Sequence, residues 1–338
     1  MASDSRPLRI ALPVAAALLG TWWVRRVILP ARPDDAGTPH ARQLPRGEPR
    51  PTTDGAGVRI VVNPTSGPAR VEPPTAVLRE GLPAADIHEM SEGDDLEALL
   101  RDPAFVAIGA AGGDGTLAAA AAIAADRDVP LVAVPAGTLN HLARDLGLDS
   151  AEDAVAAVRA GTAASIDLGM IGDRCFVNTL TFGGYSAVVD RREQLEARMG
   201  KWPALVVALV RELPRIEPLR LRLDGERVDV WLGWVGNCRY GPPGLAPAWR
   251  EELDDGLLDV RLVHGGPRHA RTRFVLAALM GRLSALSVYS EQLVESLEVE
   301  CLDGPQRLAA DGETFDAPAA FTVAKRRRAL RVALPPNE

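Results

Sequence analysis

Three glycine-containing loops, each directly after a short apolar run, constrain the fold of this chain more than any other feature. The loops are Asn63-Pro-Thr-Ser-Gly67, Gly112-Gly-Asp-Gly-Thr116 and Pro135-Ala-Gly-Thr-Leu-Asn140, and they follow runs at residues 58–62, 105–110 and 131–134. Helical stretches separate the runs, most clearly an alanine-rich segment that extends through residue 125. Short apolar strands that alternate with helices predict a parallel α/β sheet over residues 58–165.

After residue 165 the pattern changes to strands with alternating polar and apolar residues. Such strands are found at residues 219–235, 257–263, 293–304 and 321–334, and Asp224-Gly225 predicts a hairpin turn in the first of them. One helix is expected among them, at residues 268–283. Residues 166–338 are therefore predicted to form a second, mainly antiparallel β domain with sandwich-like packing.

The first 57 residues differ from the rest. An uncharged apolar run at Ile10–Val24 has arginines on both sides and a Trp pair near its end. We expect residues 1–30 to hold a membrane anchor, with the folded body on the cytoplasmic side, and residues 31–57 to form a flexible linker. An interfacial or signal-derived segment is the alternative.

Charge and cysteine usage exclude several classes of protein. The net charge of −7 argues against a nucleic-acid binder. Cys175, Cys238 and Cys301 form no CxxC pair, so neither a disulfide framework nor a zinc site is expected. Lysine occurs only at positions 201 and 325, so arginine carries almost all of the positive charge.

The three loops have the composition of a phosphate site. Loops at the carboxyl ends of parallel strands line the ligand crevice, and glycines let backbone N–H groups turn toward an anion at a helix N-terminus. The hydroxyls of Thr65, Thr116 and Thr138 add further donors. The chain contains neither a Walker A motif nor a strand-borne GxGxxG. One such loop alone could be an ordinary βα turn, but three in register favour nucleotide binding.

Asp114 lies between two glycines of the central loop. Phosphate would repel its carboxylate unless a cation intervened, and Mg²⁺ bridging carboxylate and phosphate oxygens resolves this conflict. The alternative is an Asp that accepts hydrogen bonds within its own turn.

VVNPTSG at 61–67, AGGDGTL at 111–117 and PAGTLNHLARDLGL at 135–148 resemble the signature loops of the diacylglycerol kinase catalytic superfamily, which includes bacterial lipid, sphingosine and ceramide kinases. The resemblance implies an α/β nucleotide domain packed on a β-sandwich, with ATP in the cleft between them and a last strand that could return to the first domain. The residues that it places at the nucleotide are Asn63, Pro64, Thr65, Ser91, Gly112, Gly113, Asp114, Gly115, Thr116, Leu117, Thr138 and Asn140. The family has a threonine before a Gly-Asp pair, and in this chain Ser91 precedes Gly93-Asp94 at a slightly shorter spacing.

The resemblance also assigns residues in the second half. Glu313 in Asp311-Gly-Glu313 would be the general base that takes the proton of a lipid hydroxyl, although Asp-Gly would form a hairpin turn in any case. The acidic segment near residue 255 resembles one that holds a structural Mg²⁺ in some members, with ligands Glu252, Asp255 and the backbone of Leu257. A hairpin loop without an ion is equally compatible.

Two features stay open. His141 stands where one branch of the family has aspartate, and a loop histidine without a role is the alternative. The basic cluster at residues 325–328 is compatible with contact to anionic headgroups and equally with the protection of an edge strand.

The sequence thus predicts an ATP- and Mg²⁺-dependent lipid kinase, with Asp114 and Glu313 as catalytic residues, acting on diacylglycerol at a membrane surface. A NAD kinase that shares GGDGT is the enzymatic alternative. A nucleotide- or lipid-binding protein without turnover is the non-enzymatic one.

Overall fold

The computed structural model describes residues 54–64, 74–137, 140–184, 217–241, 249–250, 252–265 and 288–335, with a few isolated residues elsewhere. The helix expected at residues 268–283 and the apolar run at residues 10–24 lie outside this part of the chain.

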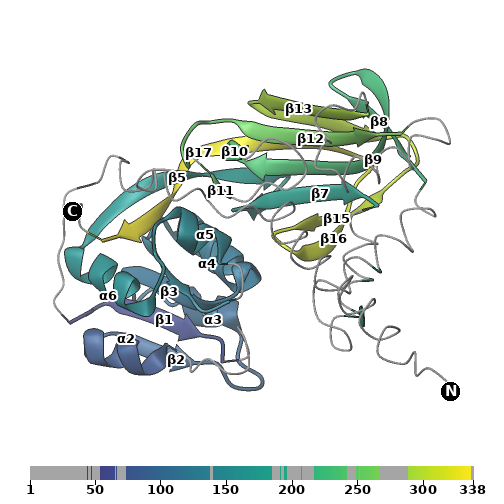
Figure 1. The fold of residues 1–338 in the computed structure, drawn as a ribbon. Coiled ribbons are helices and arrows are strands. Elements are labelled where there is room, and N and C mark those ends of the chain that lie inside the picture. The colour runs from purple at the N-terminus through teal and green to yellow at the C-terminus, as the bar shows by residue number, and fades with distance from the viewer. Residues whose placement is uncertain are drawn as a thin grey trace, which may run out of the picture.

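The first half folds as a parallel sheet with helices, as its alternating pattern predicted. Its strands are β1 (Val58–Val62), β2 (Asp86–Glu89), β3 (Ala107–Gly112) and β4 (Leu131–Pro135), and they lie in the order β4-β3-β1-β2. All three pairings are parallel. The helices are α2 (Thr75–Gly81), α3 (Leu96–Leu100), α4 (Asp114–Arg127), α5 (His141–Asp145) and α6 (Ala151–Ala160). This half lies at the lower left of Figure 1.

The second half is built from antiparallel strands, which confirms the predicted fold class. The strands are β5 (Thr162–Ile171), β6 (Arg174–Phe176), β7 (Thr179–Gly183), β8 (Leu219–Leu223), β9 (Glu226–Asn237), β10 (Tyr240–Gly241), β11 (Trp249–Arg250), β12 (Leu258–His264), β13 (Tyr289–Val294), β14 (Ser296–Cys301), β15 (Gln306–Ala310), β16 (Glu313–Ala317) and β17 (Ala320–Leu334). The path β16-β15-β7-β9-β8-β14-β17 is hydrogen-bonded throughout.

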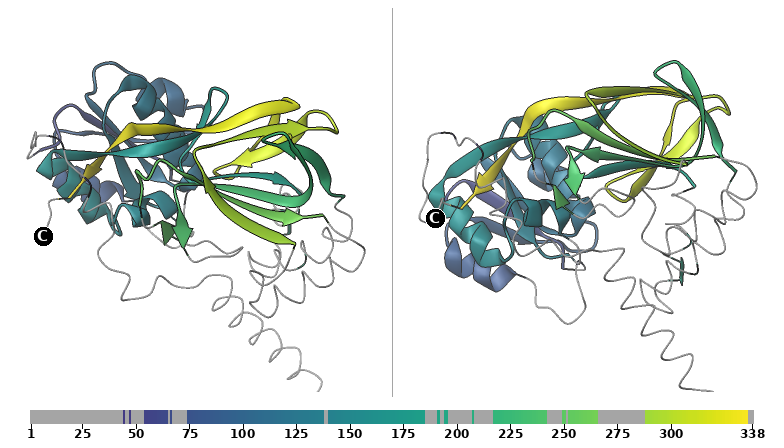
Figure 2. Two further views of the ribbon diagram at one scale, coloured as in Figure 1. Left: turned by 90° about the horizontal axis from the view of Figure 1, so that it is seen from above. Right: turned by 45° about the horizontal axis from the view of Figure 1, so that its top comes forward.

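Strands β17 and β5 join the two halves. β17 pairs antiparallel with β14 and β5, and near its end Val332 pairs with Leu131 of β4 in parallel. Figures 1 and 2 show both strands running from the helical half into the strand-rich half. β5 extends across residue 165, where the sequence pattern changes. One hydrogen-bonded sheet therefore continues through both halves.

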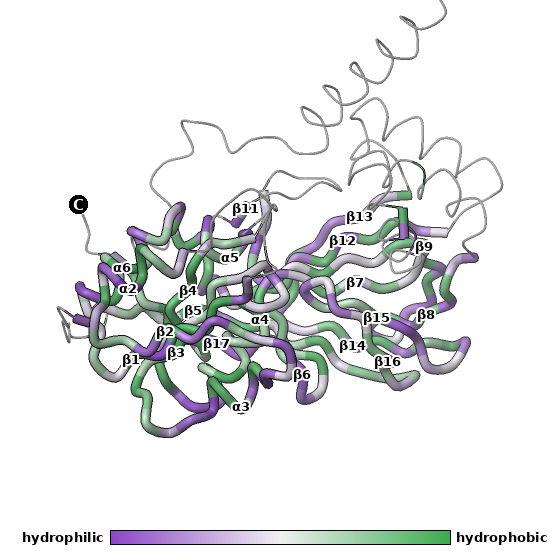
Figure 3. Tube along the Cα trace, turned by 90° about the horizontal axis from the view of Figure 1, so that it is seen from below, coloured by the Kyte–Doolittle hydropathy of each residue, from purple (hydrophilic) through white to green (hydrophobic). Residues whose placement is uncertain are grey.

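Two hydrophobic clusters form the core, one in each half. The first gathers around Ile60, Ile108 and Leu131 and includes the C-terminal residues of β17. The second is built around residues such as Phe182 and Val235 of the antiparallel strands. Hydrophobic segments follow interior strands such as β4, whereas hydrophilic segments gather at many turns (Figure 3). Burial of these side chains is the main favourable term for folding.

Two Asp-Gly turns connect neighbouring antiparallel strands as hairpins. Asp224 and Gly225 have φ of 46° and 87° between β8 and β9, and Asp311 and Gly312 have φ of 48° and 92° between β15 and β16. Two consecutive residues with positive φ are typical of a type I′ turn. The second turn makes Glu313 the first residue of β16.

The predicted membrane attachment requires correction. No helix in the described part of the chain is long and apolar enough to cross a membrane. The run at residues 10–24, which was expected to be the anchor, is also shorter than the roughly 20 apolar residues that a span requires. This finding overturns the predicted membrane-attached localisation.

Candidate functional site

The loops after β1, β3 and β4 lie at one edge of the parallel sheet, because parallel strands present their carboxyl ends on the same side. The loops after β3 and β4 are in direct contact. A Cβ built on Gly137 would lie 2.6 Å from the Cα of Gly113, so only glycine at position 137 permits this approach. The glycine-containing motifs after β3 and β4 therefore contact each other through their backbones.

The N-terminus of α4 lies at this edge of the sheet, directly after β3. Gly113 is its N-cap residue and supplies no side-chain hydrogen bond to the first turn. A Cβ built on Gly113 would meet no atom of the described residues within 4 Å, apart from its chain neighbours. Packing within the described part of the chain therefore does not explain why position 113 is a glycine. Uncapped amides beside open space suit a phosphate group.

Asp114 begins α4 and reaches the neighbouring loop. Its Oδ1 accepts a hydrogen bond from the backbone N–H of His141 at 2.8 Å, so its partner lies outside its own turn. The described residues donate no hydrogen bond to Oδ2. A half-buried carboxylate with one unshared oxygen beside a phosphate-type helix end fits a hard cation.

Asn140 holds the loop after β4 in shape. Its side-chain oxygen accepts from Gly137 N–H at 2.7 Å, and its amide nitrogen donates to the Gly137 carbonyl at 3.0 Å. Its φ of 50° places it in the left-handed region. In the structure, the side chain of Asn140 therefore stabilises this loop through its two hydrogen bonds to Gly137.

The other predicted nucleotide residues lie on several elements: Gly112 ends β3, and Gly115, Thr116 and Leu117 lie in the first turn of α4. Asn63 follows β1 and donates its N–H to the carbonyl of Ala111 at 2.9 Å, and Pro64 is exposed beside it. Ser91 lies in an exposed turn after β2, where its N–H donates to Asp94 Oδ2 at 2.7 Å. Thr65 and Thr138 lie outside the described residues.

Glu313 reaches this site from the other half of the chain. A Cβ built on Gly115 would lie 3.7 Å from Glu313 Oε1, the one atom of the described residues within 4 Å apart from its chain neighbours and its own helix backbone. Glu313 Oε2 lies 4.0 Å from Arg174 Nη1, and both side chains are largely exposed. The Arg174 guanidinium also covers the ring of Phe315 at 4.5 Å. The hairpin β15–β16 therefore places a carboxylate at the first turn of α4.

Asp311 fastens that hairpin to the strand beside it. Its carboxylate accepts hydrogen bonds from the backbone N–H groups of Val177, Asn178 and Thr179 at 2.7, 2.8 and 2.9 Å. Burial raises the pKa of Asp311 to about 6, and the three N–H donors oppose that shift. The turn that carries Glu313 is thus held by three hydrogen bonds.

A buried ion pair connects α5 to the antiparallel half. Arg250 Nε donates to Asp145 Oδ2 at 2.6 Å, with exposed fractions of 0% and 6% for the two side chains. The same guanidinium donates to the Val177 carbonyl at 2.7 Å and to Asn178 Oδ1 at 3.0 Å. Burial lowers the pKa of His141 at the start of α5. This pair anchors the helix whose first N–H supports Asp114.

The residues of the predicted structural metal site lie at the turn around residue 255. Asp255 accepts backbone N–H groups on both oxygens, from Arg239 at 2.8 Å and Leu257 at 2.8 Å. The Leu257 carbonyl accepts the N–H of Cys238 at 3.0 Å, and Glu252 is exposed. Each of these groups has its own surroundings, and the ligand set of Glu252, Asp255 and the Leu257 carbonyl stays a prediction.

Sequence reasoning missed Arg174, Asp145 with Arg250, and Asp311 as a hairpin anchor. Asp145 lies within the motif at 135–148, which was the one signal that could have drawn attention to it. Arg250 and Arg174 carry no local signal, because their partners are remote in the chain.

Comparison with known proteins agrees with the three loops. A family profile described as "Diacylglycerol kinase catalytic domain" matches residues 57–171. A Mycobacterium tuberculosis protein named "Diacylglycerol kinase" is 30% identical over 298 residues, which cover 80% of this chain and 95% of that relative. A Pseudomonas aeruginosa protein named "Probable lipid kinase YegS-like" is 31% identical over 242 residues, covering 68% of this chain and 77% of that relative.

A solved structure shares the fold. A crystal structure of a diacylglycerol kinase from Bacillus anthracis matches with a TM-score of 0.58 at 19% identity, covering 82% of this chain and 97% of that chain. These matches confirm the resemblance drawn from the three loops and the two-part architecture.

Proposed function

This chain is a lipid kinase that belongs to the diacylglycerol kinase catalytic-domain family, and we propose that it transfers the γ-phosphate of ATP to the free hydroxyl of diacylglycerol, forming phosphatidic acid. The relative from M. tuberculosis, which carries the name of that activity, supports the choice of lipid. The lipid would be taken from a membrane surface, where diacylglycerol resides.

The observation that carries the proposal is the approach of Glu313 to the first turn of α4. Its Oε1 lies 3.7 Å from where a Cβ of Gly115 would be. A phosphate bound at the helix N-terminus would therefore have a carboxylate beside it that comes from the antiparallel half. A hydroxyl between the two would have both an acceptor for its proton and a phosphorus atom to attack.

The nucleotide phosphates are assigned to the uncapped amides of α4 and to the loop after β4. Gly113 and Gly115 leave room for them, and the helix dipole favours their charge. Asp114 would hold Mg²⁺ through its second oxygen while the His141 N–H orients the first. When bound, the ion would neutralise charge on the phosphate oxygens.

Glu313 is assigned as the general base. It accepts the proton of the lipid hydroxyl as the oxygen forms its bond to the γ-phosphorus and the bond to ADP breaks. Arg174, 4.0 Å away, orients the carboxylate and adds positive charge near the transferred phosphoryl group. A positioned base contributes about 10²–10⁴-fold to such a step.

A panel assay tests the substrate. The protein is incubated with γ-labelled ATP and Mg²⁺ against detergent-dispersed diacylglycerol, phosphatidylglycerol, a sphingoid base, ceramide and NAD, and the products are separated. Label in phosphatidic acid is the expected result. Label transferred preferentially to NAD or to another lipid would overturn the assignment, and no transfer at all would favour a binding protein.

A pair of variants tests the base. Glu313→Gln should lower turnover about 10²–10⁴-fold with an unchanged Kd for ATP. Asp316→Asn, on the same strand and also exposed, is the matched control and should keep wild-type turnover. Loss of ATP binding in step with turnover would place Glu313 in the nucleotide site.

A further inference from the structure

Lys325 is one of two lysines among the 38 basic residues of the chain, and it is buried. Its side chain on β17 is 3% exposed. Its ammonium lies 3.3 Å from Asp167 Oδ2 and 3.1 Å from Cys238 Sγ, and it also donates to Asn237 Oδ1. A lysine ammonium has three N–H donors, and three acceptors surround this one.

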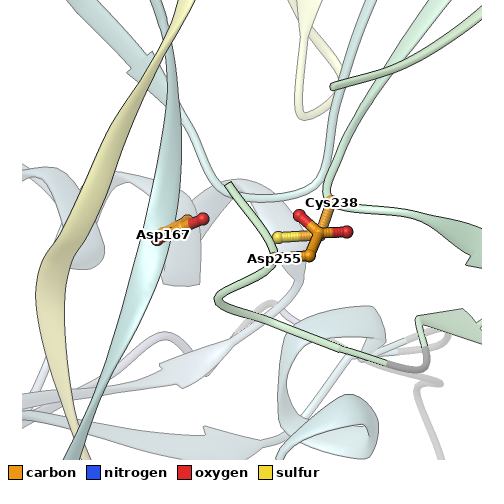
Figure 4. Close-up of side chains that lie close together, drawn as sticks. All are labelled: Asp167, Cys238 and Asp255. Carbon is orange, nitrogen blue, oxygen red and sulfur yellow. The ribbon is translucent and has the colours of Figure 1, made fainter. Parts of the chain in front are cut away.

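These acceptors coincide with a group that has the composition of a cation site. Ligand atoms of Asp167, Cys238 and Asp255 lie within 4.8 Å of one another, the one such group in the described part of the chain. Figure 4 shows Asp167 on β5 facing Cys238 and Asp255 from the opposite side. The ammonium of Lys325 therefore contacts two of the three members.

The carboxylate of Asp167 has its other hydrogen bonds from the backbone. Oδ1 accepts from the N–H of Arg328 at 2.7 Å, and Oδ2 accepts from the N–H of Gly256 at 2.8 Å. Asp167 is completely buried, so its charge needs a compensating cation within contact distance. Lys325 supplies that cation.

We propose that Lys325 is a built-in cation that takes the place of a metal ion at this junction, so that the junction is held together without a divalent ion. The junction joins β17 and β5, which run through both halves, to the end of β9 and the turn at residue 255. A divalent cation among the same ligands would be repelled by the ammonium at contact distance.

The use of lysine in an arginine-rich chain supports the proposal. A planar guanidinium distributes its charge over a fork, whereas an ammonium is a compact point charge that can stand among converging acceptors as a small metal ion does. At two other buried cation sites, Arg250 and Arg261 meet their acceptors with that fork. The chain therefore uses its rare lysine where a small cation fits.

The junction also connects to the hairpin that carries Glu313. Asn237, an acceptor of Lys325, donates through its amide to the Val177 carbonyl at 2.8 Å. Val177 in turn donates its N–H to Asp311 at 2.7 Å. An unbroken series of hydrogen bonds thus runs from Lys325 to the turn before Glu313.

The first test uses the wild-type fold. Melting temperatures are measured without nucleotide in EDTA, Mg²⁺ and Ca²⁺, and repeated in Asp114→Asn protein so that a metal at Asp114 does not contribute. The same Tm in all three conditions is expected. A rise in Tm with either ion that persists in Asp114→Asn would overturn the proposal.

The second test removes the cation. Lys325→Met should lower the Tm on the order of 10 °C, because it leaves Asp167 buried and unpaired. Arg326→Met, the neighbouring exposed cation on β17, is the control and should change the Tm little. In Lys325→Ala, the vacated group of two carboxylates and a thiol should bind Zn²⁺ or Mn²⁺, which would restore part of the lost Tm. A Lys325→Met protein as stable as wild type, or a Lys325→Ala protein unaffected by either ion, would refute the assignment.

Discussion

Removing the carboxylate of Asp145 should destabilise the protein more than any surface change, because it leaves the guanidinium of Arg250 buried without its counter-ion. The arginine is fully buried and its Nε lies 2.6 Å from the lost oxygen. Breaking a buried pair by removing one partner costs about 3–5 kcal/mol. Arg250 would keep the Val177 carbonyl and Asn178 Oδ1 as acceptors, so we expect the lower end, about 3 kcal/mol.

For Asp145→Ala, that loss corresponds to a fall in Tm of about 6–12 °C, since 1 kcal/mol shifts the Tm of a domain of this size by about 2–4 °C. Thermal unfolding followed by near-UV circular dichroism measures it. The KM for ATP should also rise, because α5 carries the His141 N–H that supports Asp114. Arg144→Ala, which removes an exposed cation of the same helix, is the control.

A double variant separates the buried charge from the loss of packing. Asp145→Leu combined with Arg250→Met removes both charges, so it should be more stable than Asp145→Ala alone. A single variant that loses less than about 2 °C, on the scale used above, would refute the reasoning. So would a double variant no more stable than the single one.

Four further substitutions test the site and the hairpin that carries Glu313. Asp114→Asn should lower turnover about a hundredfold or more while the Tm stays close to wild type, because the amide oxygen can still accept the His141 N–H; near-normal kcat would limit Asp114 to a loop contact. Gly113→Ala should fold almost normally, because its methyl group would occupy the open space over α4. The same methyl group should raise the KM for ATP at least about tenfold, which is on the order of a lost phosphate contact. Gly137→Ala should instead destabilise by about 1–3 kcal/mol, because its methyl would meet the Gly113 backbone, and melting curves with ATP titrations separate the two glycines. Asp311 has a folded-state pKa raised from 3.8 to about 6 by burial, so the folded chain takes up a proton before the unfolded chain as the pH falls. Protonation of Asp311 should therefore stabilise the folded chain progressively as the pH falls from about 6 to about 4. The urea midpoint should rise less over that pH range in Asp311→Asn than in the wild type. An identical pH profile in the two proteins would contradict the assignment.

The elements of the site could be read from the sequence because their signals are local. A β-strand run followed by Gly112-Gly-Asp-Gly-Thr116 specifies a strand, a turn and a helix N-terminus within a few residues. Asp311-Gly312 likewise adopts the positive φ values that its turn type requires. The fold class followed from the same kind of pattern, since strand and helix periods differ.

The turn near residue 255 shows that the surroundings of an acidic segment depend on residues remote in the chain. Acidic residues near a glycine resemble a cation site in the sequence, and the folded chain adds two backbone N–H donors to the carboxylate of Asp255. Whether a carboxylate is available to an ion depends on what else reaches it. The cation beside this turn comes from Lys325, 70 residues later in the chain.

The sequence by itself determined the strands, the glycine loops and the hairpin turns, because each depends on the conformational preferences of neighbouring residues. Only the tertiary structure decided which of them meet. Asp145 pairs with Arg250 across 105 positions, Glu313 lies over Gly115, and Asp167 faces Lys325. These contacts depend on how β5 and β17 pass from one half into the other. Burial then gives each pair its strength, because a charge removed from water must find its partner within the protein.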